Sequence, residues 1–285
     1  MANTKEIRRR IKTVTNIRKI TGAMKMVAAA KLKKVQSRAV NGRPYSERLR
    51  EVVENLAGSV GNVTHPLMET RPEKRVLYIV VGADRGLAGS FNTNLMNHAM
   101  REIGDRDRND IEIIAVGSKA ISFFKKRAFP TVHVLDLPKS GADYRTVTTL
   151  SEHLSKRFTE GEVDAVYMIY AKFISAMTQE PTTMRLLPMA APETSASLSG
   201  SDFTYEPSPD LLLQSLLPRY MNTLLYMALI ESQASEQGAR MSAMTAATNN
   251  ADDVIGGLTL MYNKARQSAI TTELTEIVSG AAALE

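Results

Sequence analysis

The sequence predicts an α/β fold in which a sheet domain is inserted between two long helices at the ends of the chain. Three observations predict it. Apolar residues recur every three or four positions over both terminal segments, which is typical of helices with one buried stripe. Between those segments, short runs of continuous apolar residues alternate with helical patterns, which is typical of parallel strands covered on both faces. The 67 residues from Arg219 to Glu285 contain no proline, so the last helix is far longer than an ordinary core helix.

The first segment, residues 1–57, is predicted to be one long helix. Asn3 or Thr4 is suited to cap its start. Pro44 either kinks this helix or is accommodated within it, and Gly58 ends it. Its apolar stripe is expected to comprise Ile7, Ile11, Val14, Ile17, Ile20, Met24, Val27, Leu32 and Val35.

Charge differs sharply between the two ends of the chain. Residues 1–43 contain 13 Lys or Arg and one acidic residue, Glu6, whereas Arg219–Glu285 contains four basic and seven acidic residues. Opposite signs favour pairing of the two helices, either antiparallel or parallel. The basic face of the first helix suits solvent, a nucleic acid or an acidic protein partner. Nucleic acid is disfavoured because residues 1–43 contain no aromatic residue to stack on bases and no recognisable docking motif.

The inserted domain is predicted to span residues 73–190, after a linker-like passage rich in Gly, Asn and Pro. Its strands are expected at 75–81, 111–116, 131–135, 163–171 and 182–187. Its helices are expected at 92–103, 118–127 and 144–159. The alternation of strands and helices predicts a sheet with parallel members.

The loop after the first strand, Gly82–Gly89 (GADRGLAG), suggests a nucleotide site but has the wrong spacing. It matches neither GxGxxG nor GxxxxGK[ST]. Its glycines are better suited to a tight turn and to the close approach of a helix, and the Gly117-Ser118-Lys119 run is an equally weak signal. No paired carboxylates, Ser/His/Asp set or activated lysine stands out by spacing, so we expect no catalytic residues and no bound cofactor.

Cysteine is absent, which excludes disulfides, thiol nucleophiles and thiolate metal ligands. The four histidines have no metal-site spacing, so no metal site is expected. No apolar run approaches the ~18 residues of a membrane-spanning helix. The Arg-rich start resembles an organelle transit peptide, but the same pattern continues past residue 40, so we interpret it as part of the folded protein.

The last segment, residues 209–285, follows a Pro/Ser/Gly/Ala-rich connection, Pro188–Pro209, which contains an aromatic and acidic island at Tyr205 and Glu206. Asp210 is suited to cap the last helix, and Pro218 is expected to kink it. Its seam is predicted at Tyr220, Leu224, Met227, Ala234, Met241, Met244, Thr248, Ile255, Leu258, Tyr262, Ala265 and Ala269. This seam is thin, because alanine, methionine and threonine stand where a strong zipper has leucine and isoleucine.

Several segments resemble a known family. Ile20–Ala29 (ITGAMKMVAA) is similar to the N-terminal signature of the gamma subunits of bacterial F-type ATP synthases. Glu231–Glu236 (ESQASE), Ala239–Asn249 (ARMSAMTAATN) and Ala265–Gly280 (ARQSAITTELTEIVSG) resemble the C-terminal signatures, and the Gly82–Gly89 loop resembles another. These matches lie at both ends and in the middle, so the resemblance covers essentially the whole chain.

The resemblance implies a long antiparallel coiled coil of the N- and C-terminal helices with an inserted Rossmann-like α/β domain. It implies a non-catalytic rotor in the central stalk, which couples proton-driven rotation of the c-subunit ring to ATP synthesis or hydrolysis. The implied partners are a hexamer of three alpha and three beta subunits, the epsilon subunit and the c-ring. Such a chain would lie at the cytoplasmic face of the bacterial cell membrane, as a peripheral protein attached only through the complex.

The resemblance also implies residues that contact these partners. Contacts with the alpha/beta hexamer are implied for Met24, Lys25, Arg240, Arg266, Gln267, Thr271 and Glu273. Contacts with epsilon and the c-ring are implied for Tyr205 and Glu206. Ordinary coiled-coil packing or solvation is the alternative for each residue. For the whole chain, the alternatives are a basic coiled-coil nucleic-acid-binding protein, with salt-sensitive duplex affinity, and a nucleotide-binding α/β enzyme.

Overall fold

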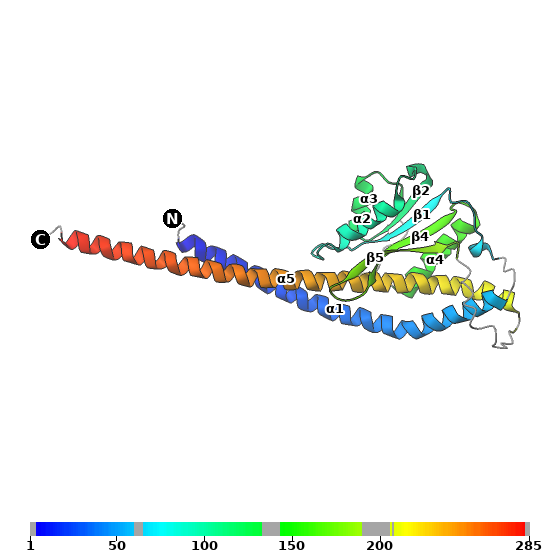
Figure 1. Cartoon of the computed structure of the whole chain (residues 1–285), viewed down its shortest axis with the longest axis horizontal. Helices are drawn as coiled ribbons and strands as arrows, with labels where there is room; N and C mark the ends of the chain where they lie inside the picture. Colours follow the sequence, from blue (N-terminus) through cyan, green and yellow to red (C-terminus); the bar gives the residue numbers. More distant parts are fainter. Residues whose placement is uncertain (1–3, 60–64, 133–142, 190–205, 207, 283–285) are drawn as a thin grey trace. The chain divides into compact units, whose positions relative to one another are not determined.

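The chain divides into two compact units. The computed structural model describes residues 4–59, 65–132, 143–189, 206 and 208–282 (Figure 1). Residues 1–28 and 240–285 form one unit, here called the helical unit. Residues 29–239 form the other, here called the sheet unit.

Two long helices, α1 (Thr4–Ser59) and α5 (Pro209–Ala282), contribute to both units. Pro44 lies inside α1 and Pro218 lies inside α5. Both prolines are exposed, so water can reach the backbone carbonyls that lose an amide partner. The structure therefore accommodates Pro44 within the first helix. The predicted cap at Asn3 and the side chain of Asp210 lie outside the described residues.

In the helical unit, α1 and α5 pair in antiparallel fashion. The Arg18 guanidinium lies 2.8 Å from the Asp252 carboxylate, and the Thr248 hydroxyl donates to the Thr21 hydroxyl over 2.9 Å. Partner numbers fall along α5 as they rise along α1, which settles the direction that charge alone left open. The predicted antiparallel coiled coil is confirmed.

The seam of the helical unit differs in part from the predicted stripe. Ile17, Ile20 and Val27 were predicted to be buried, but their side chains are 48%, 60% and 56% exposed. Ile7 and Met244 are buried as predicted, and the small residues Thr21, Ala28 and Ala251 are buried although the prediction left them out. Small side chains at the contact allow two helix axes to approach closely. The prediction was wrong at Ile17, Ile20 and Val27 because it followed the largest apolar residues.

The sheet unit contains a five-stranded sheet of order β3-β2-β1-β4-β5. Its strands are β1 (Val76–Val81), β2 (Ile111–Val116), β3 (Thr131–Val132), β4 (Ala165–Phe173) and β5 (Gln179–Leu187). Strands β1 to β4 are parallel to one another, and β5 pairs antiparallel with β4 at one edge. This order is that of a Rossmann-like half with one added edge strand, as predicted.

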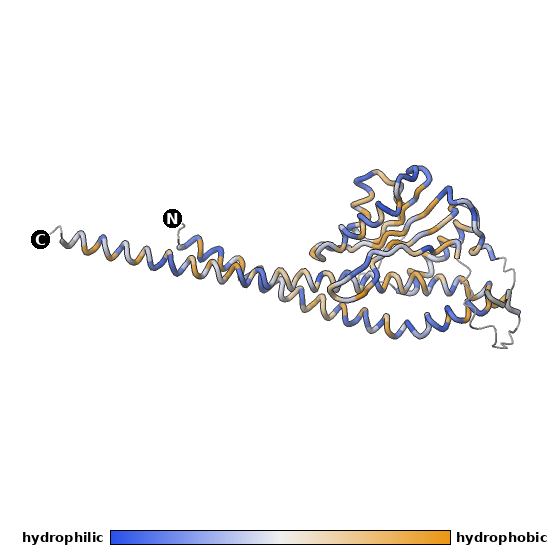
Figure 2. The backbone as a smooth tube through the Cα atoms, viewed as in Figure 1, coloured by the Kyte–Doolittle hydropathy of each residue, from blue (hydrophilic) through white to orange (hydrophobic). Residues whose placement is uncertain are grey.

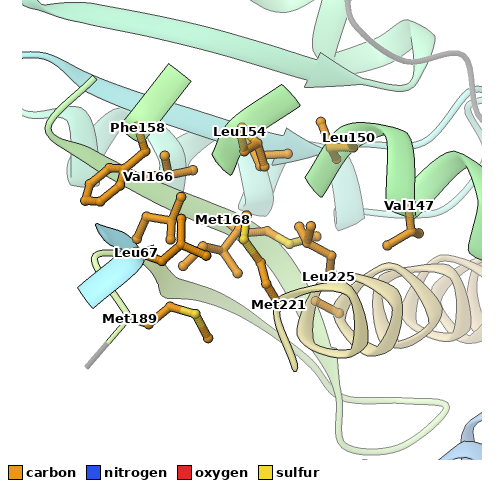
Figure 3. Close-up of a cluster of buried hydrophobic side chains, with 14 of the residues drawn as sticks. Leu67, Val147, Leu150, Leu154, Phe158, Val166, Met168, Met189, Met221 and Leu225 are labelled. Atoms are coloured by element: carbon orange, nitrogen blue, oxygen red, sulfur yellow. The ribbon is translucent and has the colours of Figure 1, made fainter. Parts of the chain in front are cut away.

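Both faces of the sheet are covered, and alternate residues of β1 divide between two cores. On one face, Val76, Tyr78 and Val80 pack with α2 (Phe91–Ile103) and α3 (Ser118–Lys126). On the other face, β1 packs with α4 (Tyr144–Thr159) and with the parts of α1 and α5 that belong to this unit. Figure 2 shows that the central strands of the sheet are largely apolar. Figure 3 shows Leu150 and Leu154 of α4, Met168 of β4 and Leu225 of α5 meeting in the second core.

The elements predicted for the inserted domain are present in the order predicted. Helix α4 and strand β2 have the predicted bounds, and Asp143 caps α4 by accepting a 2.7 Å hydrogen bond from the Thr146 amide. Strand β5 begins three residues earlier than predicted. The predicted third strand continues past Val132 into residues that are not described. Two short 3-10 helices, Pro66–Met68 and Arg108–Asp110, complete the described elements.

Candidate functional site

The glycine-rich loop after β1 serves the packing of the sheet unit. The Gly82 amide donates to the Val116 carbonyl over 2.9 Å, which ties the loop to β2. The Ala83 amide donates to the Asn92 side chain over 3.0 Å, which ties it to α2. A Cβ atom on Gly82 would lie 3.0 Å from the Cβ of Ala120 in α3. The predicted role in a close helix approach is therefore confirmed for Gly82.

The crevice where such sheets bind nucleotides is filled by the chain's own helix. Ligands of doubly wound sheets bind outside the carboxyl ends of the strands at which the strand order reverses, which here are β1 and β4. The Ser232 hydroxyl of α5 donates to the Val81 carbonyl at the end of β1 over 3.3 Å. The Ser235 hydroxyl donates to the Ala171 carbonyl of β4 over 2.9 Å. Because α5 lies against both strand ends, the geometry argues against a nucleotide-binding enzyme.

Within the described parts of the chain, no group of three or more His, Cys, Asp or Glu residues could hold a metal ion. His98 hydrogen-bonds Thr183, and the His65 ring accepts from the Leu67 amide. In the same residues, no helix is long and apolar enough to span a lipid bilayer.

Exposed apolar side chains are concentrated on the helical unit. On α1 they comprise Ile17, Ile20, Met26 and Val27. On α5 they comprise Val254, Leu260, Met261, Ile270, Leu274, Ile277 and Val278. A concentration of exposed apolar side chains on one unit is typical of a surface that contacts another protein. The helical unit is therefore the candidate binding surface.

The last turns of α5 have no helical partner among the described residues. The antiparallel register places Thr4, where the described part of α1 begins, opposite about residue 266 of α5, and every residue from Arg266 to Gly280 is exposed. An isolated helix of fewer than ~15 residues is marginal in water. This segment carries an apolar stripe at Ile270, Leu274, Ile277 and Val278, here called the tip stripe. The seam predicted for this helix contains none of these four residues, although their spacing of four, three and one is typical of a helix with one apolar face.

The residues that the family resemblance implies to contact the alpha/beta hexamer lie in two regions of the helical unit. Met24 is half-buried and Lys25 exposed on α1, and Arg240 is buried at 9% exposure on α5. The antiparallel register puts Met24 about 8 Å along the axis from Arg240. The other four, all exposed, lie beside the tip stripe: Arg266, Gln267, Thr271 and Glu273.

The Thr271 hydroxyl donates to the Gln267 carbonyl over 3.0 Å, so it is occupied within its own helix. Of the two residues implied to face epsilon and the c-ring, Glu206 is exposed. Tyr205 lies outside the described residues. The structure thus places seven of these side chains on the helical unit, and the family roles remain predictions.

Glu231, in the ESQASE segment of α5, is a half-buried carboxyl group with an unsatisfied oxygen. Its Oε2 atom is buried and has no hydrogen-bond partner among the described residues. Burial raises the pKa of the Glu231 carboxyl above its ordinary value of 4.5, while the charges of Lys172 and Arg43 act to lower it. Burial, together with the negative charge of Glu231, raises the pKa of Tyr170 to about 12.

Replacing this carboxyl with an amide, Glu231→Gln, is expected to stabilise the protein at neutral pH. A raised pKa in the folded state means that the contribution of Glu231 to stability is fully present below pH 4.5 and is lost as pH rises through the raised pKa. The variant should therefore melt at a higher temperature than wild type at pH 7.5 and equally at pH 4. Exposed Glu152→Gln on α4 is the control. A variant less stable than wild type at pH 7.5 would contradict the expectation.

Comparisons with known proteins agree with this architecture. The family model described as ATP synthase matches residues 3–284. The ATP synthase gamma chain of Desulfitobacterium hafniense is 42% identical over 285 residues, with 100% of both chains covered. That of Brevibacillus brevis is 44% identical over 280 residues, with 97% of each chain covered.

Solved structures give the same result for the fold. A chain from the central stalk and c-ring structure of Tetrahymena thermophila mitochondrial ATP synthase is 26% identical, with a TM-score of 0.59, and 80% of this chain and 99% of that chain are covered. A chain from the Euglena gracilis mitochondrial ATP synthase has a TM-score of 0.68 at 19% identity, with 99% of this chain and 94% of that chain covered. Full-length sequence matches and the shared fold lead to one conclusion: this chain belongs to the ATP synthase gamma-chain family.

Proposed function

We propose that this chain is the non-catalytic rotor in the central stalk of an F-type ATP synthase. It would couple proton-driven rotation of a c-ring to ATP synthesis or hydrolysis in a head of three alpha and three beta subunits. The observation that carries this proposal is the tip stripe, because an exposed apolar stripe that no described residue of its own chain covers is suited to contact with another chain. The filled crevice at β1 and β4 supports a role without chemistry in this chain.

A rotor must interact differently with three chemically equal beta subunits. The helical unit is suited to this, because it presents one basic helix and one mildly acidic helix. Each beta subunit would face a different side and so have a different contact free energy, which is what a shift between conformations requires. Contacts of Met24, Lys25 and Arg240 with the head would lie in one region. Those of Arg266, Gln267, Thr271 and Glu273 would lie at the tip.

The remaining partners belong to the same proposal. Epsilon and the c-ring would contact the region of Tyr205 and Glu206, and the complex would hold the chain at the cytoplasmic face of the bacterial membrane. Segments 1–57 and 209–285 would turn as one rod, with the domain at 73–190 attached to it. No described feature favours nucleic-acid binding over this assignment.

Co-expression with cognate alpha and beta subunits tests the proposal. We expect a native mass equal to three alpha, three beta and one copy of this chain. ATP should then drive rotation of a bead fixed to the sheet unit. In the same complex, amide hydrogens of residues 268–280 should exchange far more slowly than in the isolated chain, because the unpartnered helix is marginal in water. A chain that stays apart from the hexamer, or unchanged exchange in the tip, would refute it.

A further inference from the structure

Two hydrogen bonds from serine side chains join α5 to the sheet, and the proposed rotor function does not yet account for them. Most of this junction is apolar: Leu213, Leu217, Met221 and Leu225 of α5 pack into the core beside β1, β4 and α4. Apolar contacts hold a helix against a sheet but are non-directional, so they restrain its rotation about its own axis only through side-chain shape.

Over about two turns, α5 meets the sheet through small residues three positions apart, Ser232, Ser235 and Gly238, which share one helix face. Ser232 bonds the end of β1, and Ser235 bonds β4. A Cβ atom on Gly238 would lie 3.2 Å from the Cα of Ala176, in the turn between β4 and β5. Both serines are buried, at 2% and 0% exposure. The two hydrogen bonds go to different strands and Gly238 lies close to the turn, so rotating or sliding α5 would break both bonds and change the approach at Gly238.

We propose that Ser232 and Ser235 are positioning residues that form a torsional joint between α5 and strands β1 and β4. Hydrogen bonds weaken steeply with distance and angle, so the 2.9 Å bond of Ser235, and less strongly the 3.3 Å bond of Ser232, resist rotation of the helix where apolar packing does not. Because α5 continues as one helix into the helical unit, that angle sets how torque passes between the sheet unit and the rod. This inference rests on the proposed rotor function.

The test compares variants in the complex with cognate alpha and beta subunits. The double variant Ser232→Ala/Ser235→Ala removes both bonds to the strands. The matched control is Thr223→Val, because Thr223 is also buried on α5 but its hydroxyl donates to the Arg219 carbonyl of its own helix, over 2.9 Å. Both changes delete buried hydroxyl groups, and only one removes contacts between the helix and the sheet.

The readout is angular fluctuation. This chain has no cysteine, so a bead can be fixed through Lys126→Cys, which is exposed at the end of α3. With the hexamer immobilised and held by a non-hydrolysable nucleotide, the variance of the bead angle reports the torsional stiffness of the rotor. We expect the variance to rise about twofold or more in the double variant, because directional restraints are lost, and to stay at the wild-type value in Thr223→Val. ATP hydrolysis by the complex should be unchanged in both.

The outcomes separate this proposal from the proposed function. A wild-type complex whose bead does not rotate with ATP would refute the rotor itself. A rotating wild type, with equal angular variance in wild type and double variant, would overturn the joint alone. If the double variant does not assemble, the single variant Ser232→Ala, which removes only the longer hydrogen bond, replaces it. Equal angular variance in this variant and in wild type would then overturn the joint. An equal rise in the double variant and in Thr223→Val would also overturn the joint, since general loosening would then explain the result.

Discussion

Deleting residues 267–285 should lower the ATP-driven torque of the complex several-fold while ATP hydrolysis continues. The deletion removes the tip stripe, whose four side chains are 50% to 66% exposed in the isolated chain. Burying such side chains against a partner is worth about 1 kcal/mol each, so about 4 kcal/mol of contact with the head would be lost. Hydrolysis should persist because the proposal assigns no catalytic group to this chain. Rotation of a bead under viscous load measures the torque.

The same deletion should leave the thermal stability of the isolated chain unchanged. Every residue from Arg266 to Gly280 is exposed, so the melting temperature of the truncated chain should equal that of wild type. In the full-length chain, Leu274→Ser/Ile277→Ser should reproduce much of the torque loss. Thr272→Ser/Glu276→Gln, which changes exposed polar residues of the same turns, should not. Unchanged torque after truncation would exclude a role for the tip stripe.

Gly117→Ala should severely destabilise the sheet unit. Gly117 precedes α3 with φ of +87°, a conformation that alanine rarely adopts. A Cβ atom there would lie 2.3 Å from the carbonyl oxygen of Gly82. That carbonyl cannot easily move, because Gly82 is held on two sides. The Gly82 amide donates a hydrogen bond to the Val116 carbonyl, and Gly82 lies close to Ala120 of α3. Strain and clash together should cost about 3 kcal/mol or more.

Thermal unfolding checks this expectation. For a unit of this size, that loss corresponds to a fall of about 6 °C or more in Tm. Gly256→Ala is the matched control, since a Cβ atom at Gly256 of α5 would meet nothing within 4 Å. There the better helix propensity of alanine should stabilise the helix by about 0.5–1 kcal/mol. A Gly117→Ala protein that melts like wild type would show that the loop can rearrange.

The elements were predictable where local signals were strong. Helix α4 has a cap at Asp143 and a clear apolar period, and β2 is a short run of branched apolar residues, so both bounds were read correctly. Strand β5 was shortened in the prediction, because Gln179 and Glu180 are polar and lie on an edge strand. Edge strands are exposed on one side and do not show the continuous apolar pattern of central strands.

The candidate site was harder to predict for a physical reason. The periodicity of apolar residues shows which helix faces are apolar. It does not show whether such a face packs within this chain or against another protein. Ile17, Ile20 and Val27 are as apolar as seam residues, yet they are exposed, while Thr21 and Ala28 occupy the seam. A rod whose outer surface binds other proteins has two apolar faces, and the sequence pattern cannot separate them.

The serine contacts of α5 could not have been found from the sequence. Ser232 and Ser235 lie in a run of small and polar residues, and their partners in β1 and β4 are backbone carbonyls. A backbone acceptor leaves no sequence signature. The filling of the crevice between β1 and β4 is likewise a contact between distant segments, which only the three-dimensional structure reveals.

The position of α5 in the second core has a consequence for synthesis of the chain. Strand β1 leaves the ribosome long before the residues of α5 that cover its Leu77 and Ile79, and at bacterial rates the roughly 130 intervening residues take on the order of 10 s. During that time only α1 and, once it is translated, α4 can cover this apolar face, and the area that α5 covers stays open to other nascent chains. Contacts between segments so far apart in the sequence also form slowly during folding. The chain should therefore depend on a chaperone that shields this face until translation has passed residue 229.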